Sequence, residues 1–280
     1  MTAAAAPIAD YAPSTGVAKR AWRELRELVT FRHLVRHLVS TSLRTELAST
    51  RLGVIWWILD PLALTAVYYV LVSVILQVRT PHYPLYVLTA IISWEFFARS
   101  IMMSMTMTLA KEGSMRQVAY PRSAVPLAAT LTQAVHFAFG LGVVLVLLPV
   151  FGLSPGKMVL LVLPLALLEL VLTLGVAYLL AATNVFFRDV KHLTDHVLWL
   201  LFHLAPALYL ASLIPARWRG TYELNPFATL FDGFRSVVMY NRLPGTTLLH
   251  FGLLAGASLA VLAVGFICFV RASRSFAKVA

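Results

Sequence analysis

The sequence predicts an all-α integral membrane protein with six transmembrane helices. Sixty percent of its 280 residues are hydrophobic and 12% are charged, whereas soluble globular domains carry about 25% charged residues. Six apolar segments are long enough to span a bilayer, which takes roughly 20 residues. These segments are Val54–Val78, Leu85–Ala110, Ala124–Phe151, Met158–Val185, Thr194–Ile214 and Thr247–Val270.

The placement of Lys and Arg predicts the orientation. An even number of spans puts both termini on one side of the membrane. Sixteen of the 23 basic residues fall on that side, six fall on the other side, and Arg99 lies within a span. Because cytoplasmic loops carry the excess of Lys and Arg, both termini are expected in the cytoplasm. The net charge of +11 thus mainly reflects the topology. Anionic lipid or a cytoplasmic partner explains the remaining excess of basic residues better than nucleic acid does.

The N-terminal region divides into a tail and a basic helix. Residues Met1–Gly16 are rich in Ala and Pro and lack the basic start and apolar core of a signal peptide. A disordered tail is expected over residues 1–21, followed by a transmembrane domain over 22–280. Over residues 22–50, apolar side chains at helical spacing alternate with arginines. This pattern predicts an amphipathic helix in the inner membrane interface, either as a plain anchor or with a gating role.

The connection between the fifth and sixth spans also contains a helix signal. Asn225 and Pro226 are typical of a helix start, with Asn as the capping residue and Pro at the first helical position. Apolar residues then recur at helical spacing from Phe227 to Val238, with polar residues opposite. We expect short re-entrant or amphipathic helices here, which dip into the outer leaflet or line the exit of a pathway.

Four ionisable side chains within or near the spans are candidates for function, because charge inside a bilayer is costly. Glu95 and Arg99 stand four residues apart and can pair on one helix face. Asp60 is close enough to an interface to reach water. Glu169 is the most isolated acid and is expected to face the protein interior or to meet Arg or His of a neighbour. The solitary His136 and His203 are more typical of helix packing than of a ligand site.

The motifs of catalysis are missing from the sequence. There is no His-Glu-x-x-His, no Gly-x-Ser-x-Gly and no P-loop. The chain is therefore not expected to be an enzyme by itself, and a pathway-forming protein needs energy from elsewhere. The alternatives are a secondary transporter or flippase that depends on Glu169 or on the Glu95–Arg99 pair, and a membrane-embedded enzyme.

Two connections on the predicted cytoplasmic side carry charged residues. The first, Lys111–Arg122, fits either a short projecting helix or an ordinary solvated loop. The second is a short charged break between spans four and five. The residues singled out are Lys111, Glu112, Arg116, Tyr120 and Arg122 in the first connection, and Arg188, Asp189, Lys191 and His192 in the second.

Four segments, in order along the chain, carry a family resemblance. They are Arg51–Trp57 leading to Asp60–Leu62, Tyr120–Arg122 with Pro126, Asn184–Leu193, and Asn225–Phe227 with Phe234 and Arg235. Together they resemble the transmembrane permease subunit of ABC-2 type polysaccharide exporters. That family exports O-antigen, capsule, teichoic acid and galactan in lipopolysaccharide or cell-wall biogenesis.

The resemblance implies a homodimer in the bacterial plasma (inner) membrane, working with two ABC ATPase subunits. ATP and Mg²⁺ would be bound by the ATPase, and this chain would hold no cofactor. Lys111–Arg122 resembles the coupling helix that docks on the ATPase, and Arg188–His192 resembles a second cytoplasmic contact.

The substrate implied by the resemblance is a lipid-linked glycan, and the nearest alternative is a small lipid or a drug. Arg44, Arg51 and Arg122 could meet its pyrophosphate or, equally, lipid phosphates. The aromatic residues available for a sugar pathway are Tyr68, Tyr69, Phe96, Phe97 and Tyr209, although a core or lipid-facing position is more typical of any single one.

Overall fold

The computed structural model describes residues 16–49, 51–115, 120–209, 214–215, 217–218, 220, 225–244, 248–273 and 275–276, and all regular secondary structure in these ranges is helical. The helices are α1 (Val17–Thr30), α2 (Arg32–Ser49), α3 (Ile55–Tyr69) with the π-helical turn η1 (Val70–Ile75), α4 (Tyr83–Met115), α5 (Ala124–Leu147), η2 (Pro149–Phe151), η3 (Lys157–Leu161), α6 (Val162–Phe186), α7 (Val190–Leu204), α9 (Pro226–Val238) and α10 (Leu248–Ala272).

Five helices within the described ranges are long and apolar enough to cross a membrane, so the chain is a multi-pass membrane protein. They cover Ile55–Ile75, Tyr83–Ala110, Ala124–Phe151, Lys157–Phe186 and Leu249–Ala272. These five correspond to five of the six spans predicted from hydropathy.

The remaining predicted span, Thr194–Ile214, differs from its prediction. Here α7 has 15 residues and ends at Leu204. At 1.5 Å per residue it is about 22 Å long, which is shorter than the roughly 30 Å hydrocarbon core. Residues 210–213 lie outside the described ranges. A sixth crossing therefore stays a prediction.

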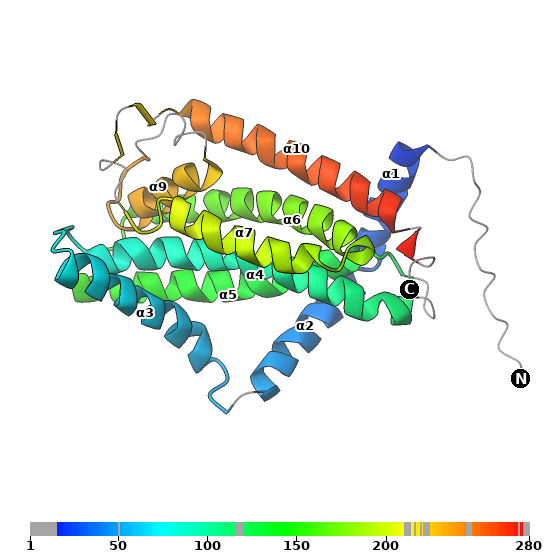
Figure 1. Ribbon diagram of the computed structural model, residues 1–280, viewed down its shortest axis with the longest axis horizontal. Coiled ribbons are helices and arrows are strands. Elements are labelled where there is room, and N and C mark those ends of the chain that lie inside the picture. Colours follow the sequence, from blue (N-terminus) through cyan, green and yellow to red (C-terminus); the bar gives the residue numbers. More distant parts are fainter. Residues whose placement is uncertain are drawn as a thin grey trace, which may run out of the picture.

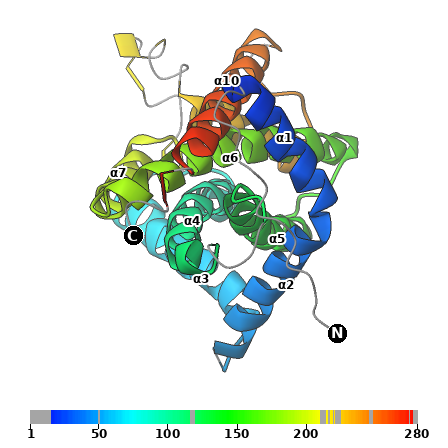
Figure 2. The ribbon, with the colours of Figure 1, turned by 90° about the vertical axis from the view of Figure 1, so that its right-hand side faces the viewer.

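The bundle is organised around α4. This helix packs against α3, α5, α6 and α7, while α10 packs along α6. Figures 1 and 2 show α4 running through the middle of the long bundle, with α1 lying across one end and α9 at the opposite end. We call these the α1 end and the α9 end. The α4 span is the most buried of the five, because its neighbours cover it on most sides.

The N-terminal amphipathic segment consists of two helices. α1 begins at Val17, so its first five residues belong to the part of the chain predicted to be a disordered tail, and Ala21 is buried. The helix ends at Phe31, and α2 restarts at Arg32. α1 packs on α10 and α2 packs on α5, with a sharp change of direction between them (Figure 2). Because α1 and α2 pack on two different helices, one straight helix over the same residues could not make both contacts.

At the α9 end, the helix signalled by Asn225 and Pro226 is present. Pro226 is the first residue of α9, and the Asn225 side chain accepts a hydrogen bond from the Phe227 amide at 2.9 Å. The polar face of α9 is not exposed to water, however, because Arg235 and Ser236 are buried together with the apolar face. α9 is thus inserted into the bundle against α4, α6, η3 and α10, whereas the sequence predicted a re-entrant or amphipathic helix that dips into the outer leaflet or lines the exit of a pathway.

Candidate functional site

Three ionisable side chains meet on the face formed by α3 and α4. One guanidinium nitrogen of Arg99, Nη2, lies 3.2 Å from Glu95 Oε1 and 3.3 Å from Asp60 Oδ2. The Glu95–Arg99 pair follows from their spacing on α4, as the sequence predicted. Asp60 joins the pair because α3 packs against α4 at this level. The sequence placed Asp60 near water and gave no signal for this contact.

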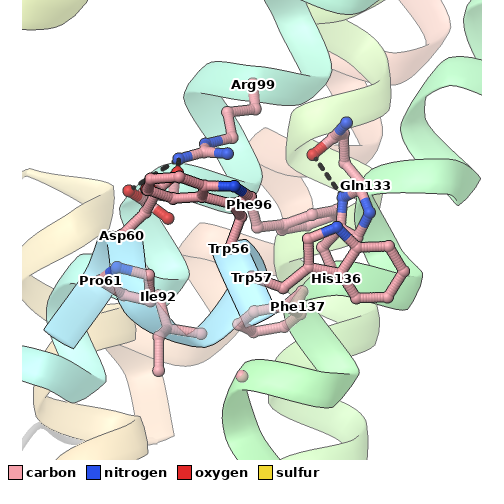
Figure 3. A pocket seen from close by; sticks show the side chains of 12 residues that line it. Trp56, Trp57, Asp60, Pro61, Ile92, Phe96, Arg99, Gln133, His136 and Phe137 are labelled. Carbon is pink, nitrogen blue, oxygen red and sulfur yellow. Dashed lines mark hydrogen bonds and ion pairs between the residues drawn. The ribbon is translucent and has the colours of Figure 1, made fainter. Parts of the chain in front are cut away.

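Aromatic and polar side chains from α3, α4 and α5 surround this cluster. Figure 3 shows them turned toward one recess, which we call the polar recess. The residues that define it in the following argument are Trp56, Trp57, Asp60, Glu95, Arg99, Gln133 and His136.

His136 joins the recess to the N-terminal helices. Its ring lies 4.1 Å from that of Trp57, and its Nδ1 is 3.0 Å from Gln133 Oε1. Its Nε2 lies 3.1 Å from Glu46 Oε2 of α2, at ion-pair distance but without hydrogen-bond geometry. The sequence assigned His136 to helix packing. In the structure it is a polar link between α2 and α5.

The exposure of the cluster indicates what it faces. The side chains of Arg99 and Asp60 are 49% and 41% exposed. Glu95 and His136 lie about 18 Å along α4 and α5, and Trp56 and Asp60 lie in the first two turns of α3, all within ranges long and apolar enough to span a membrane. An ionised side chain near the bilayer centre costs about 2.5–3.5 kcal/mol on insertion scales. A charged face at this position is therefore better suited to a polar space or a partner than to lipid tails.

Glu169 is separate from the recess. It is fully buried on α6 and accepts a hydrogen bond from Ser93 Oγ of α4 at 2.6 Å. It faces the interior as predicted, but its partner is a serine and not an arginine or histidine. Its Oε2 has no hydrogen-bond partner among the described residues. Glu169 thus links two packed helices and contributes nothing to the exposed face.

A second polar feature satisfies the backbone where α7 ends. Tyr83, Tyr86 and Arg235 donate hydrogen bonds to four consecutive carbonyl oxygens, and we call this arrangement the carbonyl clamp. The Arg235 guanidinium bonds the oxygens of Pro206 and Ala207 at 2.8 Å each and of Tyr86 at 3.0 Å, and the hydroxyls of Tyr83 and Tyr86 bond those of Leu208 and Tyr209 at 2.9 and 3.1 Å.

The clamp explains how non-helical backbone is tolerated inside a bundle. Carbonyls beyond a helix end need donors wherever water is absent. Arg235 is 4% exposed, and its guanidinium carbon lies 3.4 Å from the centroid of the Tyr86 ring. Sequence reasoning missed these roles, because the three donors and their acceptors are far apart along the chain.

Two of the five aromatic residues proposed for a sugar pathway are core residues instead. Phe96 and Phe97 are 2% and 6% exposed, and they pack on Phe137 and Phe227. The structure assigns both to packing, although Phe96 also borders the recess.

The other three proposed aromatic residues are tyrosines nearer the surface. The Tyr68 hydroxyl lies 3.2 Å from His203 Nε2, and the Tyr209 hydroxyl donates to the Leu204 carbonyl at 2.7 Å. Tyr69 is exposed. Trp56 is also exposed and lies at the recess.

The charged connections lie at the α1 end. Lys111 and Glu112 are in the final turns of α4, which continues to Met115, and Arg116 lies outside the described residues. Arg122 donates to the Ser273 carbonyl after α10 and sits over the Phe276 ring. In the connection from α6 into the first turn of α7, Arg188, Asp189 and His192 are exposed and Lys191 is half-buried. Both connections are thus at the end of the bundle where α10 also finishes (Figure 1).

The described residues contain no group of three or more His, Cys, Asp or Glu side chains able to hold a metal ion.

A second cavity, of about 310 Å³, lies at the α1 end between α1, Tyr120–Arg122 and the end of α10. Glu24 lines this cavity and accepts a hydrogen bond from Ser123 Oγ at 3.3 Å. Burial, with a smaller contribution from Glu27, raises the pKa of Glu24 above its ordinary value.

Comparison with known proteins identifies the family. The sequence pattern of the ABC-2 type transporter family matches residues 28–239. An O-antigen export system permease protein RfbA of Klebsiella pneumoniae is 27% identical over 203 residues, covering 72% of this chain and 78% of that protein. A protein of the same name from Myxococcus xanthus is 29% identical over 224 residues, covering 79% and 86%. The family match includes both the polar recess and the carbonyl clamp, and the chain belongs to the ABC-2 type transporter family.

Proposed function

We propose that this chain is the permease subunit of an ATP-driven exporter that moves a lipid-linked polysaccharide out of the cytoplasm. The observation that carries the proposal is the exposed charged face of α3, α4 and α5 inside the spans. In an ABC-2 family member such a face is suited to a polar cargo and unsuited to a purely lipidic one. The names of the similar O-antigen export permeases support a polysaccharide as that cargo.

The proposed assembly contains two copies of this chain and two copies of a separate ABC ATPase. The α1 end would face the cytoplasm of a bacterial cell, with both termini there and the spans in the inner membrane. ATP and Mg²⁺ would be held by the ATPase, whose contacts would be Lys111–Arg122 and Arg188–His192. Both segments are supported in this role by their common position at one end of the bundle.

The shape of α4 supports a route for coupling. This helix has 33 residues, so it extends about 50 Å from its first residue near the α9 end to Met115 at the α1 end. The same helix carries Glu95 and Arg99 at the recess. Closure of the ATPases on Lys111–Arg122 would therefore move the recess directly, because a continuous helix transmits displacement along its axis.

The test is depletion of the permease in its native cell. We expect surface polysaccharide to fall and lipid-linked polysaccharide to accumulate inside, with recovery when the wild-type chain is restored. Replacing Lys111–Arg122 by a flexible linker of equal length should abolish co-purification of the ATPase while leaving the chain in the membrane. Unchanged surface polysaccharide on depletion, or export that persists without any ATPase, would overturn the proposal.

A further inference from the structure

We propose that the cavity at the α1 end binds a small soluble phosphate ester from the cytoplasm. This site is separate from the polar recess. It goes beyond the proposed export function, on which it depends only for the side of the membrane that the α1 end faces. Three observations carry the proposal: the charge of the residues that line the cavity, its volume, and its position around α1.

Guanidinium groups from two distant segments of the chain line the cavity. Arg20 and Arg23 belong to α1, and Arg122 lies just before α5. A guanidinium group presents its N–H donors in a rigid planar fork, which matches the oxygens of a phosphate group. Arg122 is also held in place, because it donates to the Ser273 carbonyl and lies over the Phe276 ring. The cavity therefore offers an anion one fixed guanidinium group and two more from α1.

Two carboxyl groups line the same cavity, and they leave it positively charged. Glu27 pairs with Arg23 at 3.6 Å, and Glu24 accepts a hydrogen bond from Ser123 Oγ at 3.3 Å. With both carboxylates ionised, the three arginines and two glutamates that line the cavity give a net charge of +1. Burial raises the pKa of Glu24, so this group takes up a proton more readily than an exposed glutamate and can then donate to an anion.

The volume of the cavity indicates what the anion is attached to. At about 310 Å³, it is near the lower end of the range of roughly 300–1,000 Å³ that is typical of small-molecule pockets. A free phosphate ion would fill only part of this space. Tyr120, Pro121 and Val270 form an uncharged wall beside the arginines. A phosphate ester fits better, with its charged end at the arginines and a small organic body against this wall.

The position of the cavity around α1 favours a soluble ligand over a lipid headgroup. Trp22, Leu25 and Val29 form an exposed apolar stripe on α1, and such a stripe is suited to the membrane interface. Successive residues of a helix are turned by about 100°, which puts the α1 residues that line the cavity on the opposite side of the helix. A ligand of the cavity would therefore arrive from water and not from the lipid layer.

A bound ester would connect α1 to the end of the bundle. α1 lies next to the end of α10 (Figure 2), and Arg122 belongs to the connection proposed as an ATPase contact. Occupancy of the cavity would hold α1 in this position, because one phosphate group would bond guanidinium groups from both segments. The site would thus make this end of the permease responsive to the supply of a phosphorylated compound in the cytoplasm.

The test is equilibrium binding to the full-length chain in nanodiscs of phosphatidylcholine, a lipid without net charge. The ATPase is left out, because its nucleotide sites bind phosphate themselves. The probe is radiolabelled inorganic phosphate, and the competitors are glucose 6-phosphate and AMP. We expect saturable binding, with at least one ester displacing the probe at a lower concentration than unlabelled phosphate does. No saturable binding, or displacement by neither ester at a lower concentration, would overturn the proposal.

Charge variants within the cavity should change the affinity in opposite directions. Arg20→Gln and Arg23→Gln should each weaken phosphate binding at least about tenfold, because each removes a charge-assisted hydrogen bond. Glu24→Gln should strengthen binding severalfold by removing a negative charge. Arg26→Gln on the same helix is the matched control and should bind as wild type, since Arg26 lies over the Trp22 ring at 5.4 Å and does not line the cavity.

The Glu24→Gln variant keeps the test decisive if an arginine variant fails to fold, because a loss of packing cannot strengthen binding. Equal affinities for wild type and the three cavity variants would overturn the site. These measurements do not involve glycan, so they stand or fall separately from the export function.

A second set of nanodiscs, containing phosphatidylglycerol, presents the same phosphate chemistry attached to the membrane. We expect the same number of soluble phosphate sites for each chain in both kinds of disc. Phosphatidylglycerol that displaces the probe, and that wild type retains more strongly than Arg23→Gln does, would place a lipid headgroup in the cavity and overturn the soluble ligand.

Discussion

Arg235 is buried at the α9 end, where its guanidinium group donates to three carbonyl oxygens. We predict that Arg235→Lys destabilises the protein, because a single ammonium group cannot reproduce the planar fork of arginine. Two carbonyls left without donors cost roughly 1–3 kcal/mol each. Thermal unfolding in detergent should show a lower midpoint for Arg235→Lys than for Arg242→Lys, whose parent side chain is exposed. Equal midpoints would contradict the clamp.

The Glu24 carboxyl is predicted to make the packing of α1 dependent on pH. Burial raises its pKa in the folded chain, so the folded state binds this proton more tightly than the unfolded state. The contribution of Glu24 is thus most favourable below the ordinary pKa of a glutamate, about 4.3, and it is lost as pH rises through the raised value. Glu24→Gln removes the titrating group.

The measurement for Glu24 is the midpoint of thermal unfolding at pH 4 and at pH 7. Relative to wild type, Glu24→Gln should gain more stability at pH 7 than at pH 4. Glu27→Gln is the comparison, because Glu27 stands on the same helix, pairs with Arg23 at 3.6 Å and causes only the smaller part of the rise in the Glu24 pKa. Its gain at pH 7 over pH 4 should therefore be smaller than that of Glu24→Gln. A gain of the same size at both pH values would show that burial of Glu24 does not control its titration.

Sequence predicted one contact of the candidate site, the Glu95–Arg99 pair, from the spacing of the two residues. Glu95 and Arg99 are neighbours on any helix, so their pairing needs no tertiary information. The contact of Asp60 with Arg99 depends on how α3 crosses α4, which no local pattern encodes. Phe96 and Phe97 could be named only as candidates for a sugar pathway or as core residues, because the sequence shows that an aromatic ring is present but not which way it points.

At the scale of elements, the close packing of α6 and α10 depends on two glycines. A Cβ atom at Gly175 would lie 2.6 Å from the Leu262 amide nitrogen, and one at Gly265 would meet the Gly175 carbonyl. We predict that Gly265→Ala forces the helices apart and destabilises the protein by about 1–3 kcal/mol. Gly256→Ala on the same helix meets no atom within 4 Å. It should be neutral or slightly stabilising, because alanine favours helix.

The two glycine variants are compared by thermal unfolding under identical conditions. A lower midpoint for Gly265→Ala alone is the expected result. Equal loss in both variants would mean that helix flexibility, and not the approach of the two backbones, is what these positions require.

The elements were predicted well where hydropathy alone decides them. Five apolar segments are spans, and α9 starts where its capping residue predicts. The end of α7 at Leu204 was missed because hydropathy continues beyond it, although Pro206 directly after the cap residue Ala205 is a local signal for a helix end. The donors that bond the following carbonyls come from α4 and α9, which no local pattern shows. The break between α1 and α2 was missed as well, because each half packs on a different partner helix.

For the whole molecule, the continuity of α4 gives a test of coupling that rests on the proposed function. Ala110→Pro should break α4 between its span and its final turns, since proline removes a backbone donor and clashes with the preceding turn. We expect surface glycan to fall at least about tenfold while the ATPase still co-purifies. Ala110→Ser, which keeps the helix, is the control. Normal export by the proline variant would show that α4 does not transmit the movement.

The arrangement of the whole bundle lay beyond the sequence. Its motifs predicted the family, and the placement of Lys111, Arg122 and Arg188 on one side agrees with the position of their connections at the α1 end. The central position of α4 and the packing of α2 on α5 depend on which helix surfaces fit one another. A single sequence shows which face of each helix is apolar, but it does not show which other helix that face contacts.

The carbonyl clamp has a consequence for the environment of the α9 end. The carbonyl oxygens of residues 206–209 already accept hydrogen bonds from protein side chains. Contact with water is therefore not needed to satisfy them, and removal of water leaves none of them without a donor. The geometry of this turn is therefore indifferent to whether lipid, detergent or water lies outside. In the proposed exporter, this end of the bundle would keep its shape whether or not water reaches it.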